Sequence, residues 1–265
     1  MDWFENLNHV FQALIAGTFT WGITALGALV VCFFKEMNRK VLDTILGFSA
    51  GVMIAASFWS LLAPSIDLSA ELGYIAWLLP ALGFIIGGVF VLVSDKFLDK
   101  TLKNKTDSRG TSSLKRVILL VSAITIHNIP EGMAIGVAFG GIASNIPGVT
   151  SIGALMLALG IGIQNFPEGA AVSLPLRSEG YTRFKSFMIG QASALVEPIS
   201  AVIGAILVIY IRSLLPFLLA FAAGAMITVV ARELLPESVK ENKNLATFGL
   251  ITGFILMMIL DVALG

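Results

Sequence analysis

Charged residues are scarce in this sequence of 265 residues. They make up 13% of the chain, whereas hydrophobic residues make up 57%, and the mean hydropathy is +0.90. A typical soluble domain carries about 25% charged residues. This shortage excludes an ordinary soluble protein and predicts a chain that has lipid as its solvent.

Cysteine and histidine are nearly absent, with one Cys and two His. The single cysteine, Cys32, excludes an intramolecular disulfide, and we expect it to pack between helices because its sequence neighbours are apolar. The sequence also lacks the H-E-x-x-H motif of zinc proteases, and no nucleotide-binding motif indicates coupling to ATP.

Hydrophobic stretches recur along the whole chain, and a helix needs about 20 apolar residues to cross the hydrocarbon core. They are continuous, whereas the strands of a membrane β-barrel alternate over segments of about 10 residues. We therefore predict an all-α integral membrane protein, a single transmembrane domain over residues 1–265 with a bundle of eight helices. The predicted spans cover about residues 9–34, 41–63, 73–95, 116–140, 149–175, 184–211, 214–236 and 245–264.

Basic residues are distributed unequally between alternate connections. Only Arg212 of the 17 Lys and Arg residues falls in an even-numbered connection, and the longest hydrophilic connection, about 96–115, holds many of the others. Lys and Arg are enriched on the cytoplasmic side of membrane proteins. This pattern predicts that the loop 96–115 is cytoplasmic and that both termini are extracytoplasmic, which requires an even number of spans.

Four ionisable residues fall near the middle of the predicted fourth, fifth and sixth spans: His127, Glu131, Glu168 and Glu197. A charge at the centre of a membrane helix costs about 3 kcal/mol on insertion scales, so such residues usually face a cavity or a partner. Three carboxylates at one depth need cations, and either protons or a shared metal ion can supply them. We expect protons and metal ions to compete there.

A polar motif is repeated on two consecutive spans, as HNIPEG at 127–132 and as QNFPEG at 164–169. In each copy the first polar residue and the Glu are four positions apart, which places them on one helix face. For a single copy, mutual hydrogen bonding of structural polar groups is an equally good interpretation. Two matched copies together with Glu197 favour an ion-binding site.

Each of these acidic residues has a proline beside it. Pro130 and Pro167 precede the motif glutamates, and Pro198 follows Glu197. A proline inside a helix leaves the carbonyl four residues earlier without its donor and bends the helix. We therefore predict kinks in spans four, five and six, which would open space for an ion at the midplane.

At these residues the chain resembles the ZIP (Zrt/Irt-like) family of divalent metal transporters, in particular its bacterial zinc-transporter branch. The resemblance rests on HNIPEG, QNFPEG and the Val196-Glu197-Pro198 step, and it extends across the eight spans. It implies a binuclear metal site in which the two motif glutamates bridge the ions. The implied ligands are His127, Glu131, Gln164 and Glu168 for one ion, and Asn128, Asn165 and Glu197 for the other.

The resemblance also implies a function and a location. It implies a secondary transporter, not an enzyme, that imports Zn²⁺, and also Fe²⁺, Mn²⁺ or Cd²⁺, across the bacterial inner (plasma) membrane. We expect divalent metal ions and the lipid bilayer as partners, a homodimer, no prosthetic group and no nucleic acid. Some relatives have Asp where this chain has Asn165, so we expect weaker binding of the second ion.

Two regions outside the motif carry further expectations. Arg232 stands where many relatives have a histidine before Glu233, and an arginine cannot ligate a cation, so a cytoplasmic metal site on this helix is in doubt. His9 and Asp261 lie near the outer ends of the first and last spans, and we expect both to be hydrated.

Two other functions remain open at this point. A proton-coupled carrier of an organic solute would use the same glutamates to relay protons and would bind no metal. A metal-selective channel would use the same ligands and differ only in its rate and gating. An intramembrane metalloprotease is disfavoured because the required histidine pair is missing.

Overall fold

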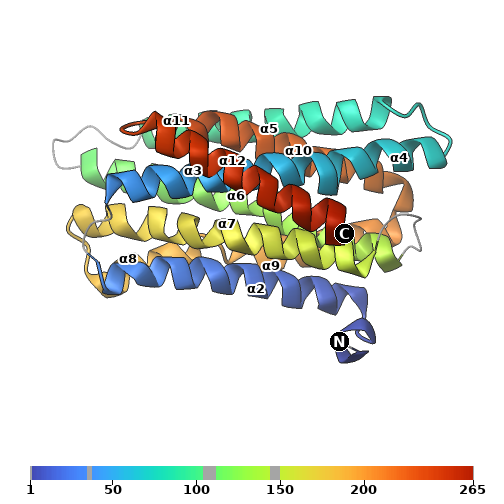
Figure 1. Cartoon of the computed structure of the whole chain (residues 1–265), viewed down its shortest axis with the longest axis horizontal. Helices are drawn as coiled ribbons and strands as arrows, with labels where there is room; N and C mark the ends of the chain where they lie inside the picture. Colours follow the sequence, from blue (N-terminus) through green and yellow to red (C-terminus); the bar gives the residue numbers. More distant parts are fainter. Residues whose placement is uncertain (1, 35–37, 104–111, 144–149, 265) are drawn as a thin grey trace.

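The computed structural model describes residues 2–34, 38–103, 112–143 and 150–264. Over these ranges all the regular structure is helical, which confirms the predicted all-α class. The helices run along one common axis (Figure 1). Their bounds are α1 (Asp2–Glu5), α2 (His9–Leu29), η1 (Val30–Cys32), α3 (Arg39–Ala56), η2 (Ser57–Leu62), α4 (Ala63–Glu71), α5 (Leu78–Lys103), α6 (Ser112–Ala143), α7 (Ser151–Ser178), α8 (Arg183–Ala192), α9 (Val196–Tyr210), η3 (Arg212–Leu214), α10 (Leu215–Val229), η4 (Val230–Leu234), α11 (Leu235–Ser238), α12 (Lys243–Ile259) and η5 (Leu260–Leu264).

Five helical segments of the described chain are long and apolar enough to cross a membrane. They are His9–Cys32, Arg39–Glu71, Arg183–Tyr210, Leu215–Ser238 and Lys243–Ala263. They correspond to the predicted first, second, sixth, seventh and eighth spans. The chain is therefore a multi-pass helical membrane protein, as its hydropathy indicates.

The connection predicted over residues 96–115 is shorter than expected. Helix α5 continues to Lys103, and α6 begins at Ser112, so only the middle of this stretch lies outside the described residues. The residues added to α5 include Lys and Leu, which have high helix propensity. A helix therefore continues beyond the hydrophobic run from which the span was predicted.

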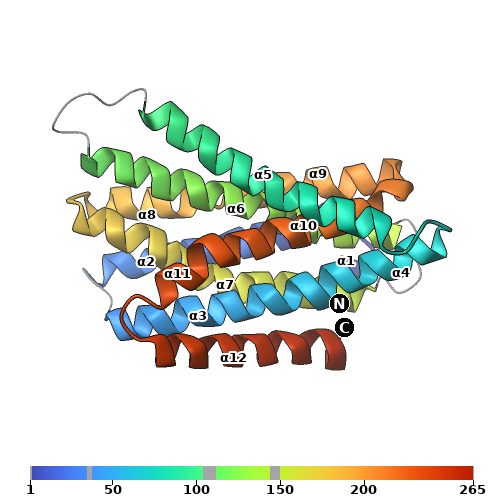
Figure 2. The same cartoon turned by 90° about the horizontal axis from the view of Figure 1, so that it is seen from above.

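The long helices pack as two groups (Figures 1 and 2). In one group α2 lies against α7 and α9, and α6 lies against α9; in the other, α3 lies against α12 and α5 lies against α10. Close approach depends on small residues, as in other membrane bundles. A Cβ added at Gly136 of α6 would lie 1.9 Å from the carbonyl oxygen of Ala201 in α9.

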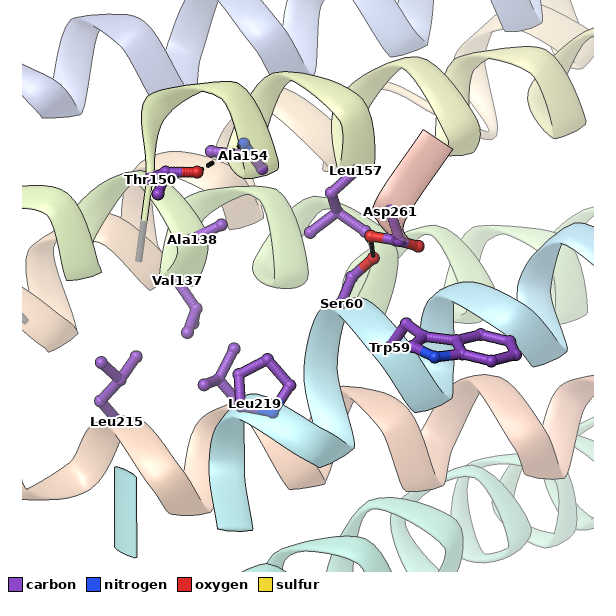
Figure 3. A pocket seen from close by; sticks show the side chains of 12 residues that line it. Trp59, Ser60, Val137, Ala138, Thr150, Ala154, Leu157, Leu215, Leu219 and Asp261 are labelled. Carbon is purple, nitrogen blue, oxygen red and sulfur yellow. Dashed lines mark hydrogen bonds between the residues drawn. The ribbon is translucent and has the colours of Figure 1, made fainter. Parts of the chain in front are cut away.

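Three helices contain π-helical segments, namely η2, η4 and η5. Such segments are rare in proteins, and those that occur are often found at functional sites. Segments η2 and η5 contact each other, and there Ser60 donates a hydrogen bond to Asp261. The expected hydration of Asp261 stays a prediction: one carboxylate oxygen accepts from Ser60 (Figure 3), and the other has no donor among the described residues.

The stretch that carries Glu197 is divided. Helix α8 ends at Ala192 and α9 begins at Val196, so Glu197 lies in the first turn of a new helix. Pro198 also lies in this first turn, where a backbone N–H has no intrahelical acceptor and a proline costs little. The break therefore places the acidic residue at a helix start in the interior of the bundle.

Candidate metal centre

The predicted site residues lie on three neighbouring helices, α6, α7 and α9. His127 lies on α6, but its side chain is outside the described part of the structure. The other six side chains are all buried, and Glu168 is the most exposed of them at 6%. These six are Asn128 and Glu131 on α6, Gln164, Asn165 and Glu168 on α7, and Glu197 on α9.

Two amide–carboxylate pairs connect the three helices. The Nε2 atom of Gln164 donates to Oε1 of Glu131 at 2.8 Å, which joins α7 to α6. The Nδ2 atom of the next residue, Asn165, lies 2.9 Å from both carboxylate oxygens of Glu197, which joins α7 to α9. The sequential pair Gln164–Asn165 thus holds two acidic residues from two other helices.

A third amide fixes the break between α8 and α9. The Nδ2 atom of Asn128 donates to the backbone carbonyl of Ser193 at 3.0 Å, within the turn that separates the two helices. All three amide nitrogens of the repeated motifs are therefore used as donors. The amide oxygens are left as the remaining polar atoms of these side chains.

Four buried oxygens of the motif have no hydrogen-bond donor within the described protein. They are Oδ1 of Asn128, Oε2 of Glu131, Oε1 of Gln164 and Oδ1 of Asn165. Leaving a buried acceptor without a partner costs about 1–3 kcal/mol, and native proteins contain few such atoms. These four oxygens on the motif residues are therefore open to a cation or to ordered water.

The carboxylates do not form a metal site by themselves. Among the described side chains, no group of three or more His, Cys, Asp and Glu residues lies close enough to hold a metal ion. Among the described side chains, the amide oxygens of Asn128, Gln164 and Asn165 are further oxygen atoms of the motif that can join Glu131 or Glu197 in a ligand set. Carboxylate and carbonyl oxygens suit hard and borderline divalent ions, whereas an imidazole such as that of His127 adds preference for transition metals.

Helix α2 contributes two hydroxyl groups that the sequence did not single out. Thr20 and Thr24 are buried on α2 beside Glu197, and their hydroxyls donate to the backbone oxygens of Gly17 at 3.0 Å and of Thr20 at 3.3 Å. The Nδ2 atom of Asn165 also lies 3.4 Å from the backbone oxygen of Thr20. The only sequence signal for these residues is their spacing of four, which places two hydroxyls on one face of an apolar helix.

A cavity of about 530 Å³ begins at the motif and extends toward one end of the bundle. Glu168 lies in its wall, together with Glu179, Arg232 and Glu233. At its far end the wall includes Arg39 and Lys240. The cavity therefore connects one motif glutamate with the basic end of the molecule.

The charges at that end are paired with one another. Arg39 binds Glu237 through Nη1 at 2.9 Å and binds Asp43 through Nε at 2.8 Å. Lys240 forms a further ion pair with Glu237. Asp43 also accepts from the backbone N–H of Asn242 at 2.8 Å. This network, which we call the Arg39 network (Arg39, Asp43, Glu237 and Lys240), ties the start of α3 to α11 and α12.

Comparison with known proteins places these features in a family. The sequence model of the ZIP zinc transporter family matches residues 99–261. The chain is 39% identical to the zinc transporter ZIP11 of Homo sapiens, over 97% of this chain and 98% of the relative. It is 39% identical to the zinc transporter ZIPB of Bordetella bronchiseptica, over 98% of this chain and 84% of the relative.

A second bacterial relative agrees with this result. The zinc transporter GufA of Myxococcus xanthus is 35% identical, over 96% of this chain and 97% of the relative. These are transporters and not enzymes, which confirms the prediction of a non-enzymatic protein. The matched region contains both repeated motifs and Glu197, so the buried centre belongs to the part of the chain that defines the family. The chain is a member of the ZIP family of zinc transporters.

Proposed function

We propose that this protein is a secondary transporter that imports divalent transition-metal ions into the cytoplasm. Zn²⁺ is the first substrate, and Fe²⁺, Mn²⁺ and Cd²⁺ are further ones. The observation that carries this proposal is the set of four buried oxygens without donors beside Glu131, Glu168 and Glu197. The relatives named as zinc transporters support the same substrate.

The proposed ligands divide into a first and a second position. At the first, the ion binds His127, Glu131, Gln164 and Glu168; at the second, it would bind Asn128, Asn165 and Glu197. The second position is weaker because Asn165 already donates to both oxygens of Glu197, and Thr20 and Thr24 lie beside the same carboxylate. Hydrogen bonds to a carboxylate stabilise its charge without a metal ion. We therefore propose one tightly bound ion per chain.

The ligand set predicts moderate selectivity. Carboxylate and amide oxygens are hard ligands. An imidazole is a borderline ligand, which zinc, iron and copper all accept. A site of this composition discriminates among divalent transition metals less than a site of thiolates does. The availability of metal ions outside the cell then contributes to which ion is carried.

We propose eight spans with both termini outside the cytoplasm of a bacterial cell, in its inner membrane. Helices α5, α6 and α7 cover the three predicted spans beyond the five apolar segments. The two ends of the described chain lie at the same end of the bundle (Figure 1), which supports an even number of crossings. On this orientation the cavity of about 530 Å³ opens toward the cytoplasm. The proposed kinks at Pro130 and Pro167 lie beside the ligands.

A homodimer is a further proposal, which rests on the family resemblance. The outward side of α5 carries large apolar residues that are exposed in the single chain, including Ile85, Val89 and Val93. Such a surface can bind lipid or a second chain. Cross-linking of single cysteines placed along α5 in native membranes would give dimers if α5 lies at the interface.

A second candidate function is a proton-coupled carrier of an organic solute. The cavity beside Glu168 favours it, because about 530 Å³ lies within the usual range of roughly 300–1,000 Å³ for small-molecule sites. A metal-selective channel would use the same ligands as the carrier. Metal binding to the purified protein would distinguish a metal carrier or metal channel from the solute carrier. A transport rate that saturates with metal concentration would distinguish the metal carrier from the channel.

The test is zinc uptake into liposomes that contain a trapped fluorescent indicator. The wild type should admit zinc, and a Glu131→Ala, Glu168→Ala double variant should not, since both changes remove proposed ligands of the first ion. Helix content and detergent stability must match between the two proteins. Equal uptake by both, or uptake by neither, would contradict the assignment and favour the solute carrier.

A further inference from the structure

Trp21 lies about midway between the two ends of the apolar segment His9–Cys32. Tryptophans of membrane proteins gather at the two membrane interfaces, where the ring is apolar and the indole N–H meets water or headgroups. At the depth of Trp21 the N–H needs an acceptor within the protein, because the hydrocarbon core supplies none. The role of this residue therefore depends on which acceptor it has.

The acceptor belongs to the break between α8 and α9. The Nε1 atom of Trp21 donates to the backbone oxygen of Gln191 at 3.0 Å and lies 3.1 Å from the Oε1 atom of the same residue. Gln191 is in the last turn of α8, and residues 193–195 form the turn that leads into α9. An indole on α2 therefore binds the backbone just before the helix start that carries Glu197.

The backbone oxygens of this break are all used within the protein. Each carbonyl oxygen of residues 189–194 accepts a hydrogen bond. Donors from other helices reach two of these oxygens, namely the indole of Trp21 on α2 and the amide of Asn128 on α6. In some transporters the carbonyls of a broken helix bind the ion instead. Here the break contributes the carboxylate of Glu197 to the centre.

The start of α9 is also packed closely against α2 and α6. A Cβ added at Gly17 of α2 would lie 2.9 Å from the Cα atom of Pro198, and one added at Gly132 of α6 would lie 2.3 Å from the backbone oxygen of Glu197. Small residues permit such close approach of membrane helices. The two helices that bind the break therefore also hold the first turn of α9.

Glu197 is connected to both proposed ion positions through α7. Asn165 holds its carboxylate, and the preceding residue, Gln164, holds Glu131. Gln164 is a proposed ligand of the first ion, and Asn165 of the second. A displacement of Glu197 would move Asn165 and the residue before it, so it would act on both positions.

We propose that Trp21 is a positioning residue of the metal centre: its indole N–H fixes the break between α8 and α9 and thereby holds Glu197 in the place from which it acts on the ion. The proposal rests on the proposed transport function. Trp21 is not itself a ligand, because an indole N–H is a donor only. Its effect on the ion should therefore depend on the carboxylate of Glu197.

The first measurement is the dissociation constant of zinc from the purified, detergent-solubilised protein. Trp21→Phe keeps an aromatic ring and removes the N–H. We expect the dissociation constant to rise about fivefold, which corresponds to about 1 kcal/mol, the usual net value of one hydrogen bond. Gln191→Leu should give a smaller rise, because the backbone oxygen still accepts from Trp21. Trp77→Phe is the matched control and should leave the constant unchanged, since Trp77 is 64% exposed and precedes α5.

The dependence on Glu197 separates positioning from a general structural role. Glu197→Gln removes the charge that Trp21 is proposed to position, so Trp21→Phe should cause no further rise in that background. A fivefold rise in the Glu197→Gln background as well would overturn the proposal, because the N–H would then act through the fold as a whole. A dissociation constant that Trp21→Phe leaves unchanged would also overturn it.

The second measurement is amide hydrogen exchange over residues 189–197 without metal, which reports local opening of the break. Exchange should be faster in Trp21→Phe than in the wild type, because the break has lost a donor from α2. Trp77→Phe should match the wild type. Equal exchange in all three proteins would overturn the proposal, since the break would not depend on the indole.

The two measurements distinguish this role from the transport function. A wild type that binds no zinc would overturn the proposed function, and hydrogen exchange would still decide whether Trp21 fixes the break. A wild type that binds zinc, with faster exchange but an unchanged dissociation constant in Trp21→Phe, would overturn the positioning role while the proposed function stands.

Discussion

The carboxylates of the centre and those of the Arg39 network have different partners. Glu131 and Glu197 accept from the neutral side chains of Gln164 and Asn165, whereas Glu237 and Asp43 are paired with cationic side chains. A carboxylate that is paired with Arg or Lys has its charge balanced within the protein. A carboxylate held by an amide receives no balancing charge from that partner. Within the described residues, the Arg39 network is balanced by cationic side chains, whereas Glu131 and Glu197 are held by neutral ones.

The largest expected effect is at the centre. Glu131→Gln removes the charge but keeps the size of the side chain. Zinc uptake into liposomes should fall by more than about 100-fold, because losing even a hydrogen-bond partner of a metal ligand costs about 10–100-fold. Thermal unfolding in detergent without metal should be unchanged or shifted upward, since a buried charge has been removed. A variant that unfolds early would point to a structural role instead.

The Arg39 network should show the opposite pattern. Arg39→Met leaves Asp43, whose side chain is fully buried, without its cationic partner. Breaking such a pair costs about 3–5 kcal/mol, so detergent-solubilised protein should unfold at a clearly lower temperature. Zinc uptake per folded molecule should stay near the wild-type value. A selective loss of uptake with normal stability would contradict this division of roles.

Asn165→Asp places a further carboxylate at the proposed second position. The new carboxylate lies beside Glu197, so the amide donor is lost and a like charge is added. Zinc bound per chain, measured by equilibrium dialysis and elemental analysis, should rise from one to two. Asn165→Ala is the control, because it removes the amide without adding charge and should bind one ion. Two ions on the wild-type protein would contradict the single-ion proposal.

The smallest effect is expected at the surface of the network. Lys240 pairs with Glu237, but its side chain is 58% exposed. Exposed ion pairs contribute about 0–1 kcal/mol, so Lys240→Gln should change neither stability nor uptake measurably. Thermal unfolding at low and high salt gives the check. A large loss of stability would mean that Lys240, and not Arg39, balances the charge of Glu237.

The repeated motif shows which features of the site could be predicted from the sequence and which could not. The spacing of His127, Glu131, Gln164 and Glu168 is a property of single helices, so it could be predicted from the sequence. The partner of each amide could not, because Gln164 and Glu131 belong to different helices and meet only through the rotation of α7 against α6. Thr20 and Thr24 were missed for the same reason, since α2 carries no motif.

The ends of the molecule give a similar lesson. The uneven distribution of Lys and Arg predicted which connections share one side of the membrane. It did not predict that Arg39 binds Glu237, which lies 198 residues further along the chain. The place of Asp261 near the outer end of the last span predicted a hydrated acid. Its contact with Ser60 joins η2 and η5, whose π-helical turns have no recognised sequence signature in this chain.

The sequence by itself determined the all-α membrane class, the polar residues that share one helix face in each motif and the membership of the ZIP family. These follow from local properties, because hydropathy decides which stretches prefer lipid and helical periodicity decides which side chains share a face. Only the tertiary structure decided which amide holds which carboxylate, which oxygens lack donors and where the cavity beside Glu168 lies. Those features depend on helix packing, which brings together residues that are far apart in the chain.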